Sequence, residues 1–355
     1  MNGKSRMLDS ETIGRITGML ESSSNPMIVT WRSGRHLEWY NALTAFANRY
    51  GIPVINYAGE FVNYPADGPM ALDHLDLRDA DLILVLEDDV PWIPSRFKPG
   101  CDVIRVDADP DFLNIPYYGI DATLKIRADI ADFLDRINPN ISREKVEDRR
   151  SRLSEMHASE LKSKREEIMR LSRSSKIHPR YLSYEIGRLG AVMFTEYQID
   201  PRYAMPLSFG SYFSTPSAGY LGIAMGSALG YRIATGKDVV AGVGDGAFYF
   251  GVPSAFGYAA KDNPILCAIY DNGGWLASAI AVDDVFPEGV AKKTGTYPGA
   301  SLKRYPIGKI IETFGGSYRL IEDPSDVGEA LHDGMGIIRD EGRPVVLQFI
   351  VERER

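Results

Sequence analysis

The chain has 355 residues, 44% of them hydrophobic and 25% charged, with a formal net charge of −8 at pH 7. This length and composition are typical of a globular protein with two domains or one large domain. The acidic balance argues against a nucleic-acid binder, because phosphate neutralisation needs a basic face. Only two cysteines occur, Cys101 and Cys267, and they form no CxxC pair, which excludes a disulfide framework and an iron–sulfur cluster held by this chain alone. No apolar run approaches the roughly 20 residues that span a bilayer, and residues 1–12 lack the apolar core of a signal peptide, so we expect a cytoplasmic protein without membrane contact.

Apolar runs alternate with helix-like segments along the whole chain. This pattern predicts an α/β fold with two Rossmann-like domains, each built around a parallel sheet. In the first half we expect strands at residues 27–31, 52–57, 81–87 and 101–107, and helices at residues 36–50 and 127–137. Together they predict a first domain at residues 1–140.

A charged segment follows the first domain. Residues 142–176 carry eleven Lys or Arg and seven Asp or Glu, and both signs are interspersed in a helix-forming composition. We interpret residues 141–176 as a solvated helical linker, with a basic docking helix as the alternative.

A second α/β pattern occupies residues 177–355. Its expected strands are residues 191–197, 238–245, 265–271 and 344–351, and its expected Gly/Ala-rich helix is residues 219–234. The small residues of this helix recur at helical spacing and would allow a backbone or a ligand to approach closely.

The stretch at residues 238–275 carries the clearest chemical signal. One hydrophobic strand ends in Gly244-Asp245-Gly246 and is followed by a helix with Pro253 at its first position. The next strand ends in the Asp-Asn-Gly-Gly sequence of residues 271–274. Two consecutive parallel strands therefore bring Asp245 and Asn272 to the carboxyl edge of one sheet, where open α/β sheets bind ligands.

These groups suit a magnesium–diphosphate site. A carboxylate, an amide oxygen and a main-chain carbonyl from the glycine pair are three hard oxygen ligands, and Mg²⁺ completes its octahedron with water and phosphate oxygens. The glycines beside Asp245 leave room for a diphosphate near the next helix N-terminus. The alternative is an ordinary strand–turn–helix of a nucleotide-binding fold without metal. A dinucleotide site is disfavoured because no GxGxxG follows a strand.

The GDG sequence at residues 244–246, with Asn272 placed 27 positions after Asp245, resembles the signature of thiamine diphosphate enzymes. The Thr-Pro-Ser-Ala sequence at residues 215–218 and the small-residue helix after it are similar to the segment beneath the thiazolium ring in this superfamily. Residues 79–86 and 103–110 resemble two strands of the central domain of the acetolactate synthase and 2-oxoacid decarboxylase group.

The resemblance implies roles for particular residues. The Mg²⁺ ligands would be Asp245, Asn272 and the carbonyl of Gly274. The remaining contacts to thiamine diphosphate would come from Glu196, Tyr197, Gln198, Ala218, Gly219, Tyr220, Gly244, Gly246 and Ala247. The central domain of some relatives holds FAD, so FAD is a further possible cofactor.

The resemblance also implies a partner. In this group an activating glutamate lies on a pyrimidine-binding domain that precedes the central domain, and the first central-domain strand begins here at about residue 27. We therefore expect a separate pyrimidine-domain subunit that supplies the glutamate, in a heterodimer or heterotetramer, and no activity without it.

The implied activity is that of a thiamine diphosphate-dependent lyase or transferase, acetolactate synthase-like. It would make or break a C–C bond next to a carbonyl, by decarboxylation of a small 2-oxo acid, by acyloin-type carboligation, or by both. Residues 276–302 would form a loop over the active site or a surface excursion. A 2-oxoacid oxidoreductase subunit and a non-catalytic regulatory or scaffolding subunit of the same fold are the alternatives.

Overall fold

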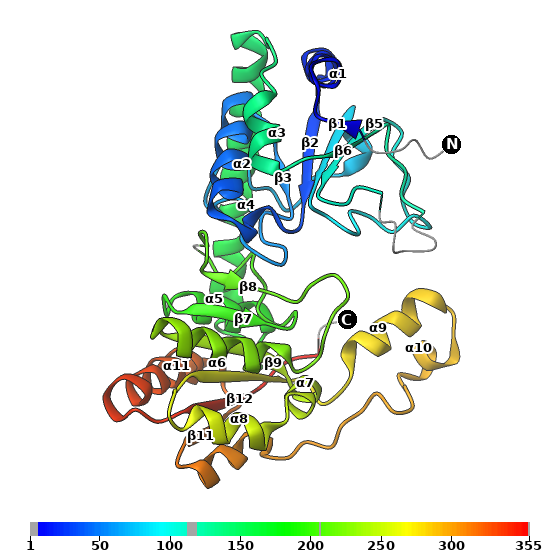
Figure 1. The fold of residues 1–355 in the computed structure, drawn as a ribbon. Coiled ribbons are helices and arrows are strands. Elements are labelled where there is room, and N and C mark those ends of the chain that lie inside the picture. Colours follow the sequence, from blue (N-terminus) through cyan, green and yellow to red (C-terminus); the bar gives the residue numbers. More distant parts are fainter. Residues whose placement is uncertain (1–5, 112–118, 206, 354–355) are drawn as a thin grey trace. The chain divides into compact units, whose positions relative to one another are not determined.

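The computed structural model describes residues 6–111, 119–205 and 207–353. The chain divides into two compact units, Met1–Lys164 with Pro206–Phe213, and Arg165–Met205 with Ser214–Arg355. Each unit contains a parallel sheet with helices, which confirms the predicted α/β class (Figure 1). Among the described residues, no helix is both long and apolar enough to cross a membrane.

The sheet of the first unit has the strand order β1-β6-β5-β4-β2-β3, and its strand pairs are parallel. Its strands are β1 (Arg6–Met7), β2 (Pro26–Thr30), β3 (Val54–Ile55), β4 (Leu82–Leu86), β5 (Asp102–Asp107) and β6 (Leu124–Arg127). Its α-helices are α1 (Ser10–Ser22), α2 (Leu37–Tyr50), α3 (Ile130–Arg136) and the greater part of α4 (Arg143–Leu171). Strands β2 and β4 are buried along their whole length, which explains why they are continuous apolar runs.

Three boundaries in the first unit differ from the sequence prediction. The strand expected at 52–57 is only β3, because Asn56 adopts a positive φ of 59° and turns the chain. The helix expected from residue 127 begins at Ile130, where the Asp129 side chain accepts hydrogen bonds from two main-chain N–H groups of the first turn. Arg127 instead ends β6, a strand that was not predicted.

The charged segment forms the 29-residue helix α4, as predicted, but its first part is not solvated. Arg149 is buried and donates to the main-chain oxygens of Ser23 at 2.5 Å and Ser24 at 3.2 Å. His157 is also buried, and its Nδ1 lies 2.7 Å from the oxygen of Ala71. These side chains bind main-chain carbonyl groups of other segments of the first unit, so the expectation of a solvated linker is wrong there.

The strands of the second unit follow the order β11-β12-β10-β9-β7, again in parallel pairs. They are β7 (Val192–Thr195), β9 (Val239–Gly244), β10 (Leu266–Asp271), β11 (Ser317–Ile321) and β12 (Val345–Ile350), while β8 (Tyr212–Phe213) belongs to the first unit and bridges Phe61. The helices are α5 (Pro179–Gly187), α6 (Ile223–Thr235), α7 (Asp245–Phe250), α8 (Pro253–Ala260), α9 (Leu276–Val285), α10 (Val290–Thr294) and α11 (Val327–Gly336).

The second unit also departs from prediction at helix starts. The helix expected from residue 219 begins at Ile223, because Gly219 and Gly222 have φ angles of 65° and 87°. A short helix, α7, starts directly after β9, ahead of the predicted helix that begins at Pro253.

The residues expected as an active-site loop, 276–302, form α9 and α10 and project beside the second sheet (Figure 1). A small core of Ala279, Tyr297 and Ala300 holds this excursion together. We call it the α9–α10 excursion below.

Candidate functional site

The two strands that carry the sequence motif are neighbours in the second sheet. Strand β9 pairs with β10 in parallel, and Gly244 lies opposite Tyr270 in the register. Asp245 follows Gly244, and Asp271 follows Tyr270, so both carboxylates lie at the same carboxyl edge of the sheet. The turn at residues 272–274 follows at that edge.

Asp245 is a buried carboxylate at the first position of α7, with 4% of its surface exposed. Burial, together with the smaller effect of the nearby negative charge of Asp271, raises its pKa to about 6. The N–H groups of Gly246 and Gly274 donate to the carboxylate and oppose this shift. The hydrogen bond from Gly274 ties Asp245 to the turn that carries the other two predicted metal ligands.

The turn at residues 272–274 depends on two glycines. Gly273 has φ of 76°, and Gly274 has φ of 154° with the Ala300 oxygen 2.0 Å from the position that a Cβ would take. Asn272 places its buried Oδ1 without a hydrogen-bond partner among the described residues. Because buried oxygen atoms are nearly always satisfied, an orphaned amide oxygen on the turn that is hydrogen-bonded to Asp245 is suited to a cation.

The loop after β7 carries residues that were predicted to contact the diphosphate. The side-chain Oε1 of Gln198 is buried and also lacks a partner in the described part of the chain, and its Nε2 lies 3.0 Å from a Cβ built on Gly244. Tyr197 has a positive φ of 77° and an exposed side chain. Gln198 therefore lies against the glycine that ends β9.

Glu196 is engaged within the protein. It is fully buried, and its two carboxylate oxygens accept from the N–H groups of Gly222 at 2.7 Å and Ala224 at 2.8 Å. Burial raises its pKa, while these two N–H groups oppose the shift. Glu196 thus organises the start of α6.

The remaining predicted residues lie on two segments. Ala218, Gly219 and Tyr220 lie in the loop before α6, and a Cβ on Gly219 would lie 2.9 Å from the Tyr197 hydroxyl. Ala247 is buried in α7.

A side chain covers Gly246. The ring of Trp275 lies 2.3 Å from where a Cβ on Gly246 would sit, and it packs edge-on against Phe250 at 5.6 Å between ring centroids. Only glycine leaves room for this ring.

A cavity of about 480 Å³ is lined by three of the predicted residues, Tyr197, Gln198 and Asn272. The other walls include Arg180, Arg202, Asp200, Tyr270, Leu276, Ile280 and Glu352. This volume is within the usual range for small-molecule sites. The two residues with orphaned side-chain oxygens, Gln198 and Asn272, therefore line the same cavity.

Sequence reasoning gave no role to three polar residues at this edge. Asp271 accepts from Gln348 Nε2 at 2.7 Å and from Arg304 Nε at 3.3 Å. The sequence could have indicated a role for Gln348, because it is a single polar residue within an otherwise apolar buried strand. Arg304 carried no such signal.

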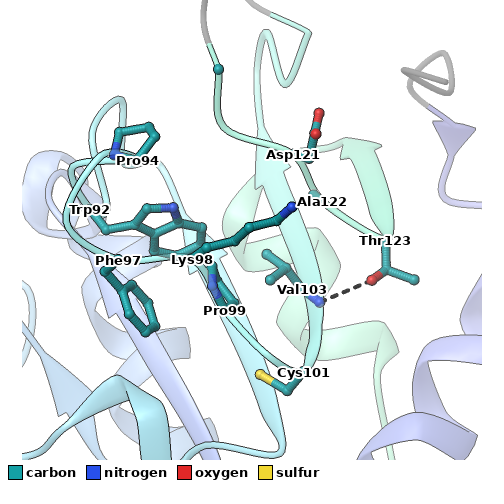
Figure 2. Close-up of a pocket in the computed structure, with 11 residues that line it drawn as sticks. Trp92, Pro94, Phe97, Lys98, Pro99, Cys101, Val103, Asp121, Ala122 and Thr123 are labelled. Atoms are coloured by element: carbon teal, nitrogen blue, oxygen red, sulfur yellow. Dashed lines mark hydrogen bonds between the residues drawn. The ribbon is translucent and has the colours of Figure 1, made fainter.

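The first unit has a cavity of similar size, about 480 Å³, lined from the segments before β5 and β6 (Figure 2). Trp92, Phe97 and Val103 form apolar walls, and Lys98 extends toward Ala122. No predicted site residue lines this cavity.

The carboxyl edge of the first sheet is acidic. Glu87, Asp88 and Asp107 are buried there, and burial raises the pKa of Asp88 to about 6. Arg32 pairs with Asp89 through two contacts of 2.6 Å. A ligand at this edge would therefore meet carboxylates.

A family model matches part of the second unit. Residues 199–349 match the family model described as thiamine pyrophosphate enzyme, C-terminal TPP binding domain. This region is therefore similar to the C-terminal domain of the thiamine pyrophosphate enzymes. It contains β9, β10 and the turn at 272–274, so the thiamine diphosphate motif and the family match coincide. No curated protein sequence matches the chain.

A solved structure resembles the fold over its full length. This is the thiamine diphosphate-dependent 4-hydroxybenzoylformate decarboxylase of Rhodococcus jostii RHA1, with a TM-score of 0.71 and 18% sequence identity. The match covers 100% of this chain and 66% of the decarboxylase chain. At this identity the similarity is one of fold.

The predicted thiamine diphosphate site differs from metal centres made only of ionisable side chains. Among the described residues, no group of three or more His, Cys, Asp or Glu is placed to hold a metal ion. The predicted Mg²⁺ set needs no such group, because it combines one carboxylate with an amide oxygen and a main-chain carbonyl. Its donors are the hard oxygens that Mg²⁺ prefers.

Proposed function

We propose that this chain is a subunit of a thiamine diphosphate- and Mg²⁺-dependent enzyme that makes or breaks a C–C bond next to a carbonyl. The observation that carries the proposal is the buried Asp245 carboxylate hydrogen-bonded to the Gly274 turn, with the orphaned Asn272 oxygen on that same turn. The family match at residues 199–349 supports the choice of cofactor. Asp245, Asn272 and the carbonyl of Gly274 would hold Mg²⁺.

The chain's own groups would bind and orient the cofactor's diphosphate. Gln198 lines the cavity and lies against Gly244, and Gly246 and Ala247 follow at the start of α7. When bound, thiamine diphosphate supplies a nucleophilic carbon and an electron sink for C–C bond chemistry. The solved decarboxylase, named for 4-hydroxybenzoylformate, favours a small 2-oxo acid as the substrate class.

We further propose that a partner subunit supplies the activating glutamate. Glu196 is the glutamate among the predicted site residues, and both of its oxygens already accept hydrogen bonds from α6. A group committed in this way is poorly placed to exchange a proton with a cofactor ring.

Titration calorimetry of thiamine diphosphate, with and without Mg²⁺, tests the cofactor assignment. We expect Asp245→Ala to abolish the Mg²⁺-dependent part of binding, because the only carboxylate of the predicted ligand set is lost. Asp262→Ala is the matched control, since that carboxylate is 72% exposed and pairs with Lys261. Unaltered binding by Asp245→Ala would refute the metal assignment.

Activity tests the partner. The purified chain alone should show negligible turnover of 2-oxo acids, and a co-purified pyrimidine-domain subunit should restore it. Robust turnover by the chain alone would overturn the heteromeric proposal while leaving the cofactor assignment intact. Cofactor binding without turnover in every combination would favour a scaffolding subunit.

A further inference from the structure

A second carboxylate lies directly behind the predicted metal turn. Asp271 ends β10 and is 1% exposed. Its Oδ1 accepts from the N–H of Gly273 at 3.0 Å and from Arg304 Nε at 3.3 Å, and its Oδ2 accepts from Gln348 Nε2 at 2.7 Å. Asp271 therefore binds the middle of the turn on one side and two distant parts of the chain on the other.

The partner on β12 is itself fixed. Gln348 is buried, and its Nε2 also donates to the main-chain oxygen of Tyr305 at 2.8 Å. Its Oε1 accepts from the Tyr318 hydroxyl at 3.0 Å. Because both ends of the amide have partners, rotating it would break hydrogen bonds at each end, and Asp271 is held in one orientation.

The turn is also tied to the segment that closes the α9–α10 excursion. The N–H of Leu302 donates to the oxygen of Gly273 at 2.9 Å, and the N–H of Trp275 donates to the oxygen of Ala300 at 2.8 Å. The Arg304 guanidinium reaches over the same glycine, with Nε 3.5 Å from the position of a Cβ on Gly273. The turn is thus held between Asp271 and residues 300–304.

We propose that Asp271 and Arg304 are positioning residues that hold the Asn272 amide and the Gly274 carbonyl in the geometry that Mg²⁺ requires. This inference rests on the proposed function. Mg²⁺ demands near-ideal octahedral geometry, so a small rotation of the turn would displace two of its three protein ligands. Groups that orient metal ligands are worth about 10- to 100-fold in metal affinity.

The chemistry of residue 271 makes the inference specific. A carboxylate has two acceptor oxygens. One can accept hydrogen bonds from Gly273 and Arg304, and the other can accept from Gln348. An asparagine has one acceptor oxygen, and its NH₂ group would face the NH₂ group of Gln348. Asp271→Asn therefore loses the hydrogen bonds on one side of residue 271 without changing the size of the side chain.

The test is the affinity of the full chain for Mg²⁺ at a fixed thiamine diphosphate concentration, together with its affinity for thiamine diphosphate without Mg²⁺. We expect Asp271→Asn and Arg304→Gln to weaken Mg²⁺ binding about tenfold or more, with Mg²⁺-free cofactor binding unchanged. Arg304→Lys should recover part of the loss, because an ammonium keeps the charge but not the planar fork. Lys303→Gln is the control, since Lys303 is exposed and stacks on the Tyr305 ring at 5.3 Å.

The outcomes separate this inference from the proposed function. Wild-type Mg²⁺ affinity in both Asp271→Asn and Arg304→Gln, with Asp245→Ala inactive in binding, overturns the positioning role alone. An equal loss of cofactor affinity with and without Mg²⁺ means a purely structural role and also overturns it. Arg304 is half exposed, so Arg304→Gln remains informative even where Asp271→Asn fails to fold. Wild-type Mg²⁺ affinity in Asp245→Ala removes the proposed function and this inference together.

Discussion

Replacing Asp245 with Asn should stabilise the ligand-free protein at pH 8 while it removes Mg²⁺-dependent cofactor binding. Burial raises the pKa of Asp245 from 3.8 to about 6. The ionised carboxylate then costs about 3 kcal/mol above pH 6, since one pKa unit corresponds to about 1.36 kcal/mol. An asparagine removes that charge, but it has only one acceptor oxygen for the two N–H donors. One N–H group is left without a partner, and this lowers the unfolding free energy by about 1 kcal/mol. The expected net gain in unfolding free energy is about 2 kcal/mol.

The pH dependence identifies the cause. Because the pKa is raised in the folded state, the cost is small below about pH 4, grows between 3.8 and about 6, and is complete above that window. In urea denaturation of the ligand-free proteins, Asp245→Asn should therefore have a higher unfolding free energy than wild type at pH 8. Near pH 4 its unfolding free energy should be equal to or lower than that of wild type. The exposed control Asp262→Asn should differ little from wild type at either pH. A variant less stable than wild type at pH 8 would refute the burial argument.

Three further predictions concern the same residues and the rest of the fold. Mg²⁺ affinity, followed by calorimetry between pH 5.5 and 8, should fall as the pH drops through about 6, because a protonated Asp245 is a poor ligand; a flat profile would contradict this. Gly274→Ala should lower the unfolding free energy by about 2 kcal/mol and weaken Mg²⁺ binding, since its methyl would overlap a carbonyl oxygen, whereas Gly226→Ala in open space should do neither. Arg149→Met should cost about 2 kcal/mol in urea denaturation by leaving the main-chain oxygens of Ser23, Ser24 and Tyr50 without this donor, and Arg143→Met, at an exposed position, should cost little.

The sheet and the edge that carries the site were predictable because local sequence determines them. Strands β9 and β10 are buried along their whole length, so each is a continuous apolar run that ends where the polar motif begins. Parallel pairing then brings both strand ends to one edge. The helix starts were not predictable in this way, because a single positive φ at Gly222 decides where α6 begins. Glycine permits that φ but does not require it.

Polar contacts between distant residues were also out of reach of local patterns. Gln348 and Asp271 are 77 positions apart, and Arg149 donates to an oxygen 126 positions away. The composition of α4 indicated a solvated helix, since charges of both signs usually face water. Which of its arginines is buried depends on where free carbonyl groups lie in the folded unit, and that information is absent from the helix itself.

The site concentrates negative charge that the fold only partly compensates. Asp271 is paired with Arg304, but half of the arginine side chain is exposed, so water screens its charge. Asp245 receives N–H donors from two glycines, and in the described ranges no cation is recorded within ion-pair distance of it. Removing water from a carboxylate raises the cost of its charge and also strengthens its attraction to a cation, because Coulomb energy grows as the local dielectric falls. The burial that destabilises the ligand-free protein at Asp245 is therefore the same property that would favour Mg²⁺, and stability and binding should change in opposite directions when this one side chain is neutralised.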